Sequence, residues 1–260
     1  MYTNLLEKPC GLVNSGNSCY LNAVLQSITA VPIFQRNVAQ YDFKGTKYLM
    51  MKNFIRAANR GEVFTPTFPK LSADKQEDAH GYMLSLMEND IPKLCTIFIS
   101  TVNIKSMCTE RPCTGCNFQH DQQFNDIDIP VSGITDIREG FAHFTHGDFL
   151  QQGWDRCDIC GAENAQPDRE RHINTFPDCL IVKATRFKQN WAGGREKESG
   201  NIFCPPILRD ADVAQLHHAG KGPGEDYHLV SIVVHRGSSL SSGHYIAYTR
   251  YGVKWYECSD

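Results

Sequence analysis

The chain has 260 residues, of which 41% are hydrophobic and 21% are charged, and its formal net charge is −3. This length can bury a sizeable core, and the slightly acidic balance gives no reason to expect nucleic acid or an anionic membrane surface as a partner. No apolar run is long enough to cross a membrane, and no basic-then-apolar leader opens the sequence, so we expect a soluble chain without a membrane segment.

The segment 11–26 combines a turn with the start of a helix. Glycines and asparagines fill its first half, and apolar residues from 21 to 28 then recur at the spacing of one buried helical face, which is expected to end near Pro32. Cys19 falls in the first helical turn, where backbone N–H groups and the helix dipole favour a thiolate. Taken alone, a small buried cysteine is the commoner interpretation. Asn14, in the same turn, can donate to an oxyanion at a carbon that Cys19 attacks, although turn formation also explains it.

This segment reads G-L-V-N-S-G-N-S-C-Y-L-N-A-V-L-Q, and it resembles the cysteine box of the ubiquitin-specific protease family, G-L-x-N-x-G-N-T-C-Y-x-N-A-x-L-Q. The main departure is Ser18 in place of threonine. The resemblance implies that Cys19 is a nucleophile and that Asn14 stabilises the oxyanion. It also implies an α+β, papain-like fold with the right-hand architecture of a helical thumb, a β-sheet palm and zinc-ribbon fingers.

Two further helices are predicted before residue 95, at 48–60 and from about 74 or 75 to 90. The second carries the sequence Q-E-D-A-H, which on its own fits a solvated acidic first turn. It also resembles the family's Q-x-D-A-x-E-F box, whose aspartate helps to hold the extended ubiquitin tail. By this resemblance Gln76 and Asp78 bind the substrate. Gly81 stands where the family usually has glutamate, and glycine has no side chain to make that polar contact with the tail.

The middle of the chain carries a metal-binding pattern. Four of the eleven cysteines form two Cys-x-x-Cys pairs, Cys113 with Cys116 and Cys157 with Cys160. Two such pairs can close a tetrahedral Cys₄ zinc site, whose metal replaces core that the polar intervening chain lacks. Chance spacing and disulfides are the alternatives, and Cys108 is a substitute ligand. Such cysteine usage favours an intracellular compartment, cytoplasmic or nuclear, although a protein exported into a host cytosol would look the same.

The family resemblance makes this cysteine-rich segment the zinc-ribbon fingers that cradle ubiquitin. It implies one catalytic domain over 1–260, with subdomains 1–95 (thumb), 96–175 (fingers) and 176–260 (palm). The remaining predicted elements are strands at 97–105 and 124–130, a helix burying residues 137, 141 and 144, a strand at 176–187 buried on both faces, a loop at 188–201 and a short strand at 202–206.

The segment 227–248 predicts two strands joined by a serine-rich loop, with His244 opening the second strand. Imidazole titrates near neutrality, so His244 can take the Cys19 proton and pass it to a leaving amine. For an isolated histidine a surface or core role is commoner, and the chain has ten. The sequence G-H-Y followed by an alternating strand resembles the family's histidine box. This makes His244 the base and places Gly243 and Tyr245 among the substrate-binding residues.

The sequence leaves the third residue of this site open. W-Y-E-C-S-D at 255–260 resembles the family's W-x-x-F-[DN]-D element, with Ser259 at the usual Asp or Asn and Asp260 at the second acid. A hydroxyl can hydrogen-bond the ring but cannot stabilise imidazolium as a carboxylate does, so electrostatics favour Asp260 and alignment favours Ser259. The family continues into a further strand after this element, and we expect low activity if that strand is missing.

Together these motifs predict a thiol-dependent deubiquitinase that cleaves after the C-terminal glycine of ubiquitin, with ubiquitin or polyubiquitin conjugates as partners and structural Zn²⁺ as cofactor. Two alternatives stay open. One is a weakly active or inactive ubiquitin-binding scaffold, suggested by the incomplete third position. The other is a protease for a different ubiquitin-like modifier, suggested by Gly81. The net charge and the lack of a clustered Lys/Arg stripe disfavour a nucleic-acid module.

Overall fold

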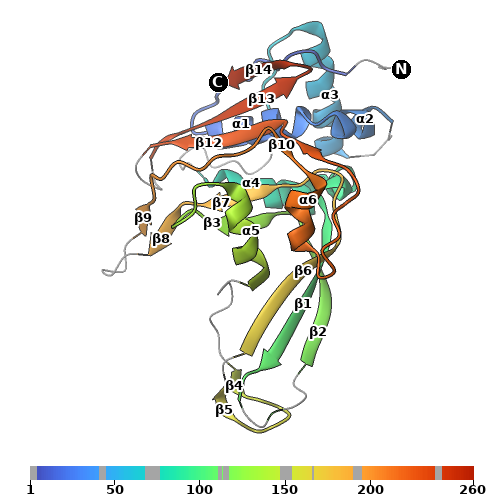
Figure 1. Ribbon diagram of the computed structural model, residues 1–260. Coiled ribbons are helices and arrows are strands. Elements are labelled where there is room, and N and C mark those ends of the chain that lie inside the picture. Colours follow the sequence, from blue (N-terminus) through green and yellow to red (C-terminus); the bar gives the residue numbers. More distant parts are fainter. Residues whose placement is uncertain are drawn as a thin grey trace. The chain divides into compact units, whose positions relative to one another are not determined.

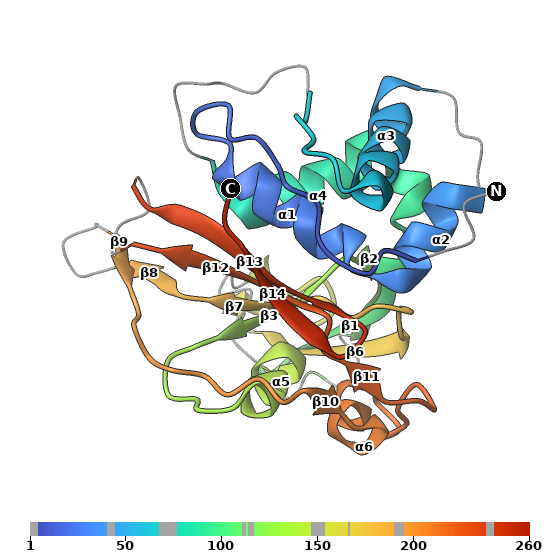
Figure 2. The same cartoon turned by 90° about the horizontal axis from the view of Figure 1, so that it is seen from above.

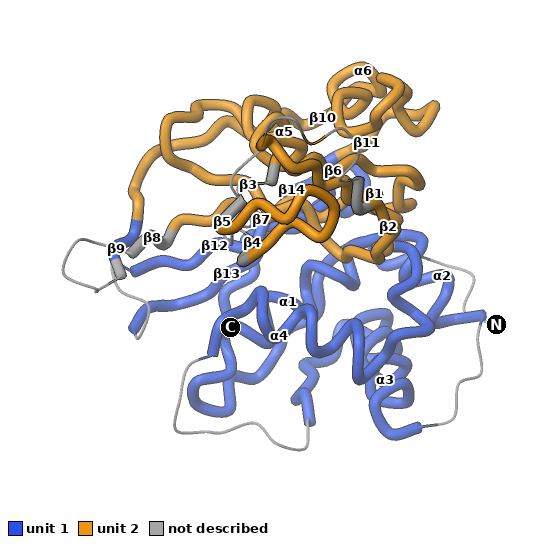
Figure 3. The backbone as a smooth tube through the Cα atoms, turned by 90° about the horizontal axis from the view of Figure 1, so that it is seen from below, with its two compact units in different colours: residues 1–97, 191–197, 229–260 blue, residues 98–190, 198–228 orange. Residues whose placement is uncertain are grey.

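The computed structural model describes residues 5–40, 45–67, 77–110, 113, 117–146, 154–165, 167–189, 195–237 and 242–260. The chain divides into two compact units (Figure 3). Unit 1 comprises residues 1–97, 191–197 and 229–260, and unit 2 comprises residues 98–190 and 198–228. Unit 1 therefore combines the two ends of the chain. The three subdomains expected from the sequence stay a prediction.

Unit 1 is built on helix α1 (Cys19–Thr29), all of whose residues are buried. As predicted, it begins at Cys19 and ends shortly before Pro32. The sequence did not predict α2 (Pro32–Gln40), which begins at that proline because a first helical turn does not need the missing N–H. Helix α3 (Thr46–Arg60) ends as predicted at Gly61, whose φ of 70° is left-handed.

The helix predicted from about 74 to 90 begins later in the described residues. It consists of α4 (Ala79–Ser85) followed by the π-helical turn η1 (Leu86–Asp90), and the short 3₁₀ turn η2 (Pro92–Leu94) comes next. Asp78 lies outside the helix as its N-cap, because its side chain accepts a 2.8 Å hydrogen bond from the backbone N–H of Gly81. Gln76 lies outside the described residues.

The C-terminal part of unit 1 is an antiparallel sheet in the order β12-β13-β14, with β12 at Ser231–Arg236, β13 at His244–Tyr251 and β14 at Lys254–Cys258. The predicted hairpin forms, with its first strand beginning at Ser231, and Arg236 pairs with His244 at the end next to the connecting loop. Helix α1 packs against β13 and β12, and Figure 2 shows it lying along this sheet. Cys19, the first residue of α1, and His244, the first residue of β13, therefore belong to a helix and a sheet that pack against each other.

The loop predicted at 188–201 contains short strands in the structure, β8 (Phe187–Gln189) and β9 (Arg195–Lys197). Lys197 donates from Nζ to the carbonyl oxygens of His235 at 2.8 Å and Gly237 at 2.6 Å. These long-range bonds fix a polar segment whose local sequence does not favour a strand.

Unit 2 contains an antiparallel sheet in the order β2-β1-β6 (Figure 1). Its strands are β1 (Ser100–Cys108), β2 (Asn117–Phe124) and β6 (Pro167–Thr175). The strand predicted at 97–105 is shifted towards the C-terminus because the 3₁₀ turn η3 (Thr96–Phe98) precedes it. The predicted helix is α5 (Ile137–His146), which packs on β6 and on β3 (Ile127–Pro130). Buried aliphatic and phenylalanine side chains of these elements form the core of the unit.

Three strand predictions in unit 2 are wrong in extent. The strand expected at 124–130 begins only at Ile127 as β3, because Phe124 is the last residue of β2. The strand expected at 176–187 is β7 (Val182–Thr185), which is half-buried and not buried on both faces, and its described partner in the sheet is β3. In place of a strand at 202–206, Phe203 makes a single bridge with Asp136. The other short elements are β4 (Trp154–Arg156), β5 (Glu163–Ala165), β10 (Ile207–Leu208), α6 (Asp210–Val213), η4 (Ala214–Leu216) and β11 (Tyr227–His228). Among the described helices, none has the length and hydropathy needed to cross a bilayer.

Candidate active site

The turn before α1 is held by side chains. The amide oxygen of Asn14 accepts from the Ser18 backbone N–H at 3.4 Å and from the Ser18 hydroxyl at 3.1 Å. Because the oxygen of this exposed amide is engaged, its N–H groups are the part that can donate to another molecule. Cys19 follows as the first residue of α1, and it is only 5% exposed.

The residue just before β13, Gly243, lies so close to its neighbours that they leave no room for a side chain. Its φ is 159°, and a side chain there would overlap His235 Nε2 and the carbonyl oxygen of Arg236. Only glycine fits this position without a shift of the backbone. The next residue, His244, keeps 39% of its side chain exposed.

Both residues that the sequence left open as the third member reach His244. Its Nε2 lies 3.0 Å from the Ser259 hydroxyl oxygen and 3.5 Å from Oδ1 of Asp260. Since Nε2 faces these two groups, Nδ1 is the ring nitrogen that can serve a reacting atom. Ser259 is the nearer partner, whereas Asp260 supplies negative charge and is only 3% exposed at its side chain.

Asp260 is held by Asn22, a residue to which no motif assigned a role. Asn22 donates from Nδ2 to Oδ2 of Asp260 at 2.9 Å and to the carbonyl oxygen of Val13 at 3.2 Å. Asn22 is 3% exposed in the middle of a buried helix. A buried amide requires polar partners, and that requirement is the signal in the sequence that could have identified it.

A second pair of polar residues, Asp78 and Tyr245, links the start of α4 to β13. The Tyr245 hydroxyl donates to Oδ1 of Asp78 at 3.2 Å. Burial, and secondarily the charge of Asp78, raise the pKa of Tyr245 to about 12, so the phenol remains a donor at neutral pH. Asp78 uses its other oxygen to cap α4. The predicted partner Gln76 lies outside the described residues.

Unit 2 carries a cluster of four cysteines, and the sulfur atoms of Cys108, Cys113, Cys157 and Cys160 all lie within 4.8 Å of one another. The Cys108–Cys160 and Cys113–Cys157 sulfur distances are 3.9 and 4.0 Å. A tetrahedral zinc with Zn–S bonds of about 2.3 Å separates its sulfurs by about 3.8 Å, so this donor set fits zinc.

Three of the four predicted ligands are in this cluster. Cys116 lies outside the described residues, and Cys108, the alternative ligand, is present. Thiolates are the form that binds a metal ion, so all four cysteines must be reduced for the site to form.

A protein-family model described as "Ubiquitin carboxyl-terminal hydrolase" matches residues 10–260. The chain belongs to this family. Among similar curated proteins of the family, "Ubiquitin carboxyl-terminal hydrolase 17-like protein D" of Mus musculus is 24% identical over 96% of this chain and 50% of its own length. "Ubiquitin carboxyl-terminal hydrolase 16" of Arabidopsis thaliana is 25% identical over 100% of this chain and 29% of its own length. The chain thus spans about half, or less, of these two ubiquitin carboxyl-terminal hydrolases.

Comparison with solved structures shows a similar fold. The SAGA Ubp8/Sgf11/Sus1/Sgf73 DUB module bound to ubiquitin aldehyde contains a chain that matches with a TM-score of 0.71 and 16% identity, over 99% of this chain and 66% of that chain. The likeness confirms the predicted α+β fold of ubiquitin-specific proteases, and the four-cysteine cluster is consistent with their zinc-ribbon fingers.

Proposed function

We propose that this chain is a thiol-dependent deubiquitinase that hydrolyses the amide bond after the C-terminal glycine of ubiquitin. The observation that carries the proposal is the environment of His244, whose Nε2 faces Ser259 and Asp260 within the unit that also contains Cys19. Helix α1, which begins at Cys19, packs on the strand that begins at His244. Family membership supports the same chemistry.

In the first half of the proposed reaction, His244 takes the thiol proton of Cys19 and the thiolate attacks the glycine carbonyl carbon. The carbonyl oxygen becomes an oxyanion, which the Asn14 amide and nearby backbone N–H groups stabilise. Collapse of this intermediate breaks the C–N bond, and the leaving amine receives the proton from His244. Ubiquitin is then held as a thioester on Cys19.

In the second half, His244 takes a proton from water, and the resulting hydroxide attacks the thioester carbon. The C–S bond breaks, the proton returns to Cys19, and ubiquitin leaves with a free carboxylate. Ser259 orients the ring through its 3.0 Å contact, and the buried charge of Asp260 stabilises the imidazolium that forms in both halves. The two residues therefore share the third role.

The substrate tail is proposed to bind near Asp78, Tyr245 and Gly243. The Asp78–Tyr245 hydrogen bond joins α4 to β13, and both side chains offer polar atoms to an extended peptide. A glycine at position 243 also keeps the backbone accessible to a narrow diglycine tail. A role for Gln76 in binding the tail stays a prediction.

Zinc is proposed as a structural ion held by Cys108, Cys113, Cys157 and Cys160. These residues come from the end of β1, from the following loop and from the turn between β4 and β5. Bound zinc would supply stability by joining segments that share little apolar core. We further propose an intracellular location, where reduced thiols persist.

Gly81 is the observation that favours a second candidate substrate, a different ubiquitin-like modifier. Its backbone N–H donates to the Asp78 carboxylate, but glycine offers no side chain to a substrate tail. Probes made from ubiquitin and from several ubiquitin-like modifiers, each carrying a C-terminal electrophile, distinguish these candidates. We expect the ubiquitin probe to label the chain most strongly.

The same probe tests the mechanism. Cys19→Ala should abolish covalent labelling, whereas Cys204→Ala, which removes a half-buried thiol of unit 2, should leave it unchanged. Labelling that persists in Cys19→Ala would reject the nucleophile assignment. Ubiquitin binding by the wild-type chain without labelling or hydrolysis would instead support a non-catalytic scaffold.

A further inference from the structure

Lys197, the last residue of β9, connects this strand to the end of β12 within unit 1. Its Nζ donates to the carbonyl oxygens of His235 and Gly237, and it lies 3.3 Å from Nδ1 of the His235 ring. An ammonium group has three N–H donors, and these three acceptors surround it. The half-buried lysine is therefore held beside the end of β12.

The contact with Lys197 determines which nitrogen of His235 carries the proton. An ammonium can only donate, so Nδ1 accepts and, in a neutral imidazole, the proton lies on Nε2. Burial of the ring, and secondarily the positive charge of Lys197, lower the pKa of His235, and the charge of Asp78 opposes this shift more weakly. The ring is therefore neutral at neutral pH, with one tautomer favoured.

The His235 ring contacts residues that are proposed to bind the substrate tail. His235 and Tyr245 lie opposite each other on neighbouring strands, and their ring centroids are 4.7 Å apart. Nε2 of His235 is the atom nearest to the place that a side chain on Gly243 would occupy. Tyr245 extends this line of contacts to Asp78 through its hydrogen bond. Lys197 is thus connected to the proposed tail site through a single histidine.

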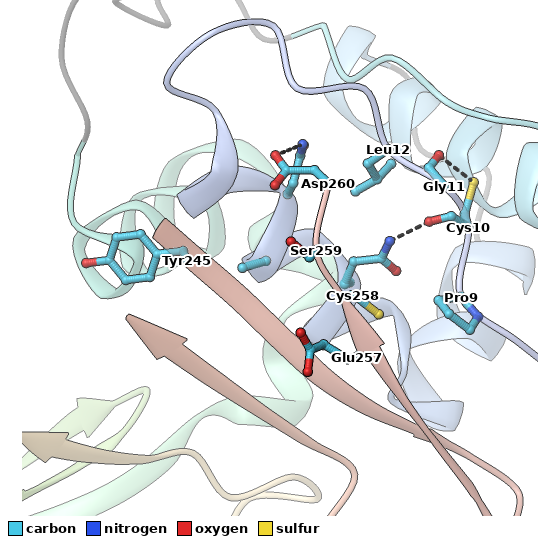
Figure 4. A pocket seen from close by; sticks show the side chains of 12 residues that line it. Pro9, Cys10, Gly11, Leu12, Tyr245, Glu257, Cys258, Ser259 and Asp260 are labelled. Atoms are coloured by element: carbon cyan, nitrogen blue, oxygen red, sulfur yellow. Dashed lines mark hydrogen bonds between the residues drawn. The ribbon is translucent and has the colours of Figure 1, made fainter. Parts of the chain in front are cut away.

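His244 is held by a different set of contacts, because its ring faces Ser259 and Asp260. These two residues and Tyr245 line one cavity, and Figure 4 shows the Tyr245 hydroxyl directed away from Ser259 and Asp260. A change that moves the Tyr245 ring should therefore alter binding of the tail before it alters proton transfer by His244.

We propose that Lys197 is a positioning residue for the ubiquitin tail, and that it acts through His235. The ammonium holds the imidazole with Nδ1 as the acceptor, and the imidazole in turn orients the Tyr245 ring and fills the space beside Gly243. This role rests on the proposed function, because the tail belongs to ubiquitin. Binding and the state of the His235 ring can both be measured without turnover, so the two proposals can fail separately.

The binding test uses Cys19→Ala, which should not cleave its ligand, and two probes, intact ubiquitin and ubiquitin without its C-terminal diglycine. Adding Lys197→Met should weaken the binding of intact ubiquitin at least about fivefold in isothermal titration calorimetry and leave the binding of truncated ubiquitin unchanged. The matched control is Lys183→Met, which removes an ammonium bound to Asp128 in unit 2 and should change neither affinity. Equal weakening of both probes by Lys197→Met, or no weakening of either, would overturn the proposal.

A double-mutant cycle tests the route through His235. His235→Ala should itself weaken the binding of intact ubiquitin, and Lys197→Met should then cause no further loss, because the ring on which it acts is absent. Two losses that simply multiply would show that Lys197 acts by another route.

Steady-state kinetics supply a second readout in the active chain. Lys197→Met should raise KM for a ubiquitin C-terminal amide at least about fivefold and leave kcat within about twofold of the wild type. A fall in kcat with an unchanged KM would assign Lys197 to His244 and overturn its role in tail binding.

If Lys197→Met does not fold, the wild-type chain still provides a test through the ring ¹⁵N signals of its histidines. The His235 signals, identified as those that His235→Ala removes, should show the proton on Nε2 at neutral pH. A proton on Nδ1 would overturn the proposal. Diglycine-dependent loss of ubiquitin binding in Lys197→Met, in a chain whose wild type hydrolyses no ubiquitin amide, would support the role of Lys197 and reject the deubiquitinase assignment.

Discussion

Asn22 and Asp260 lie 238 positions apart in the sequence and are joined by a 2.9 Å hydrogen bond from Nδ2 to Oδ2. The other oxygen of Asp260 faces His244, so a single amide on α1 holds the acid that faces the imidazole. The same amide donates to the carbonyl oxygen of Val13, next to Asn14. Asn22 therefore links both the turn that carries Asn14 and the acid beside His244 to one helix, α1.

Replacing Asn22 should consequently affect both catalysis and stability. Asn22→Leu leaves the buried Asp260 carboxylate without its donor, which should cost about 1–3 kcal/mol in unfolding free energy. We expect kcat to fall about 10- to 100-fold because Asp260 no longer holds a fixed position beside His244. The measurements are chemical unfolding and steady-state hydrolysis of a ubiquitin C-terminal amide.

A pH profile separates this positioning role from general destabilisation. In Asn22→Leu the acidic limb of kcat/KM, which reports the ionisation of the catalytic pair, should shift relative to the wild type. The matched control is Asn59→Leu, which removes an amide that donates to the Ile55 carbonyl oxygen within α3. An unchanged profile in Asn22→Leu, with only a lower unfolding free energy, would make Asn22 a purely structural residue.

The division of work between Ser259 and Asp260 can be measured directly. Ser259→Ala removes a neutral hydrogen bond to His244 and should lower kcat by less than about tenfold. Asp260→Asn keeps the shape but removes the charge that stabilises the imidazolium, and should lower kcat by about 10- to 100-fold. Steady-state kinetics of the two variants decide the point, and a larger loss in Ser259→Ala would assign the third role to the serine.

The sequence predicted the parts of this site that local patterns control. The start of α1 at Cys19 follows from helical periodicity after a turn, and the pairing of β12 with β13 follows from alternation around a serine-rich loop. Family motifs supplied His244, Ser259 and Asp260. No local signal showed that both of the last two face the ring, because these contacts depend on how the C-terminal residues pack against α1.

The errors have two other causes, namely contacts distant in sequence and a local choice of helix cap. The segment 188–201 is polar, yet β9 forms where Lys197 bonds to the carbonyl oxygens of His235 and Gly237. The late start of α4 reflects a cap by Asp78, an acidic residue that could equally have lain inside the first turn. Asn22 was overlooked because an asparagine in a helix shows its role only when its partner's position is known.

Asp78 has two roles that substitution can separate. Asp78→Asn keeps an oxygen to cap α4 and should change the unfolding free energy by only a few tenths of a kcal/mol, whereas Asp78→Ala should cost about 1 kcal/mol. If the charge also binds the substrate tail, both variants should raise KM for a ubiquitin substrate several-fold. Thermal unfolding and steady-state kinetics provide the comparison. Normal KM in Asp78→Asn would limit this residue to capping.

The zinc ligands offer the sharpest comparison between sequence and structure, because the spacing predicted Cys116 and the cluster contains Cys108. The fully reduced chain should bind about one zinc per molecule, as four thiolates imply. Cys108→Ser should weaken zinc affinity by at least about tenfold, measured by competition with a chromophoric chelator under reducing conditions. Cys204→Ser, which alters a cysteine outside the cluster, should bind zinc like the wild type. Cys116→Ser provides the deciding arm: if it abolishes binding and Cys108→Ser does not, the paired Cys-x-x-Cys spacing identifies the ligands and Cys108 is only a neighbour.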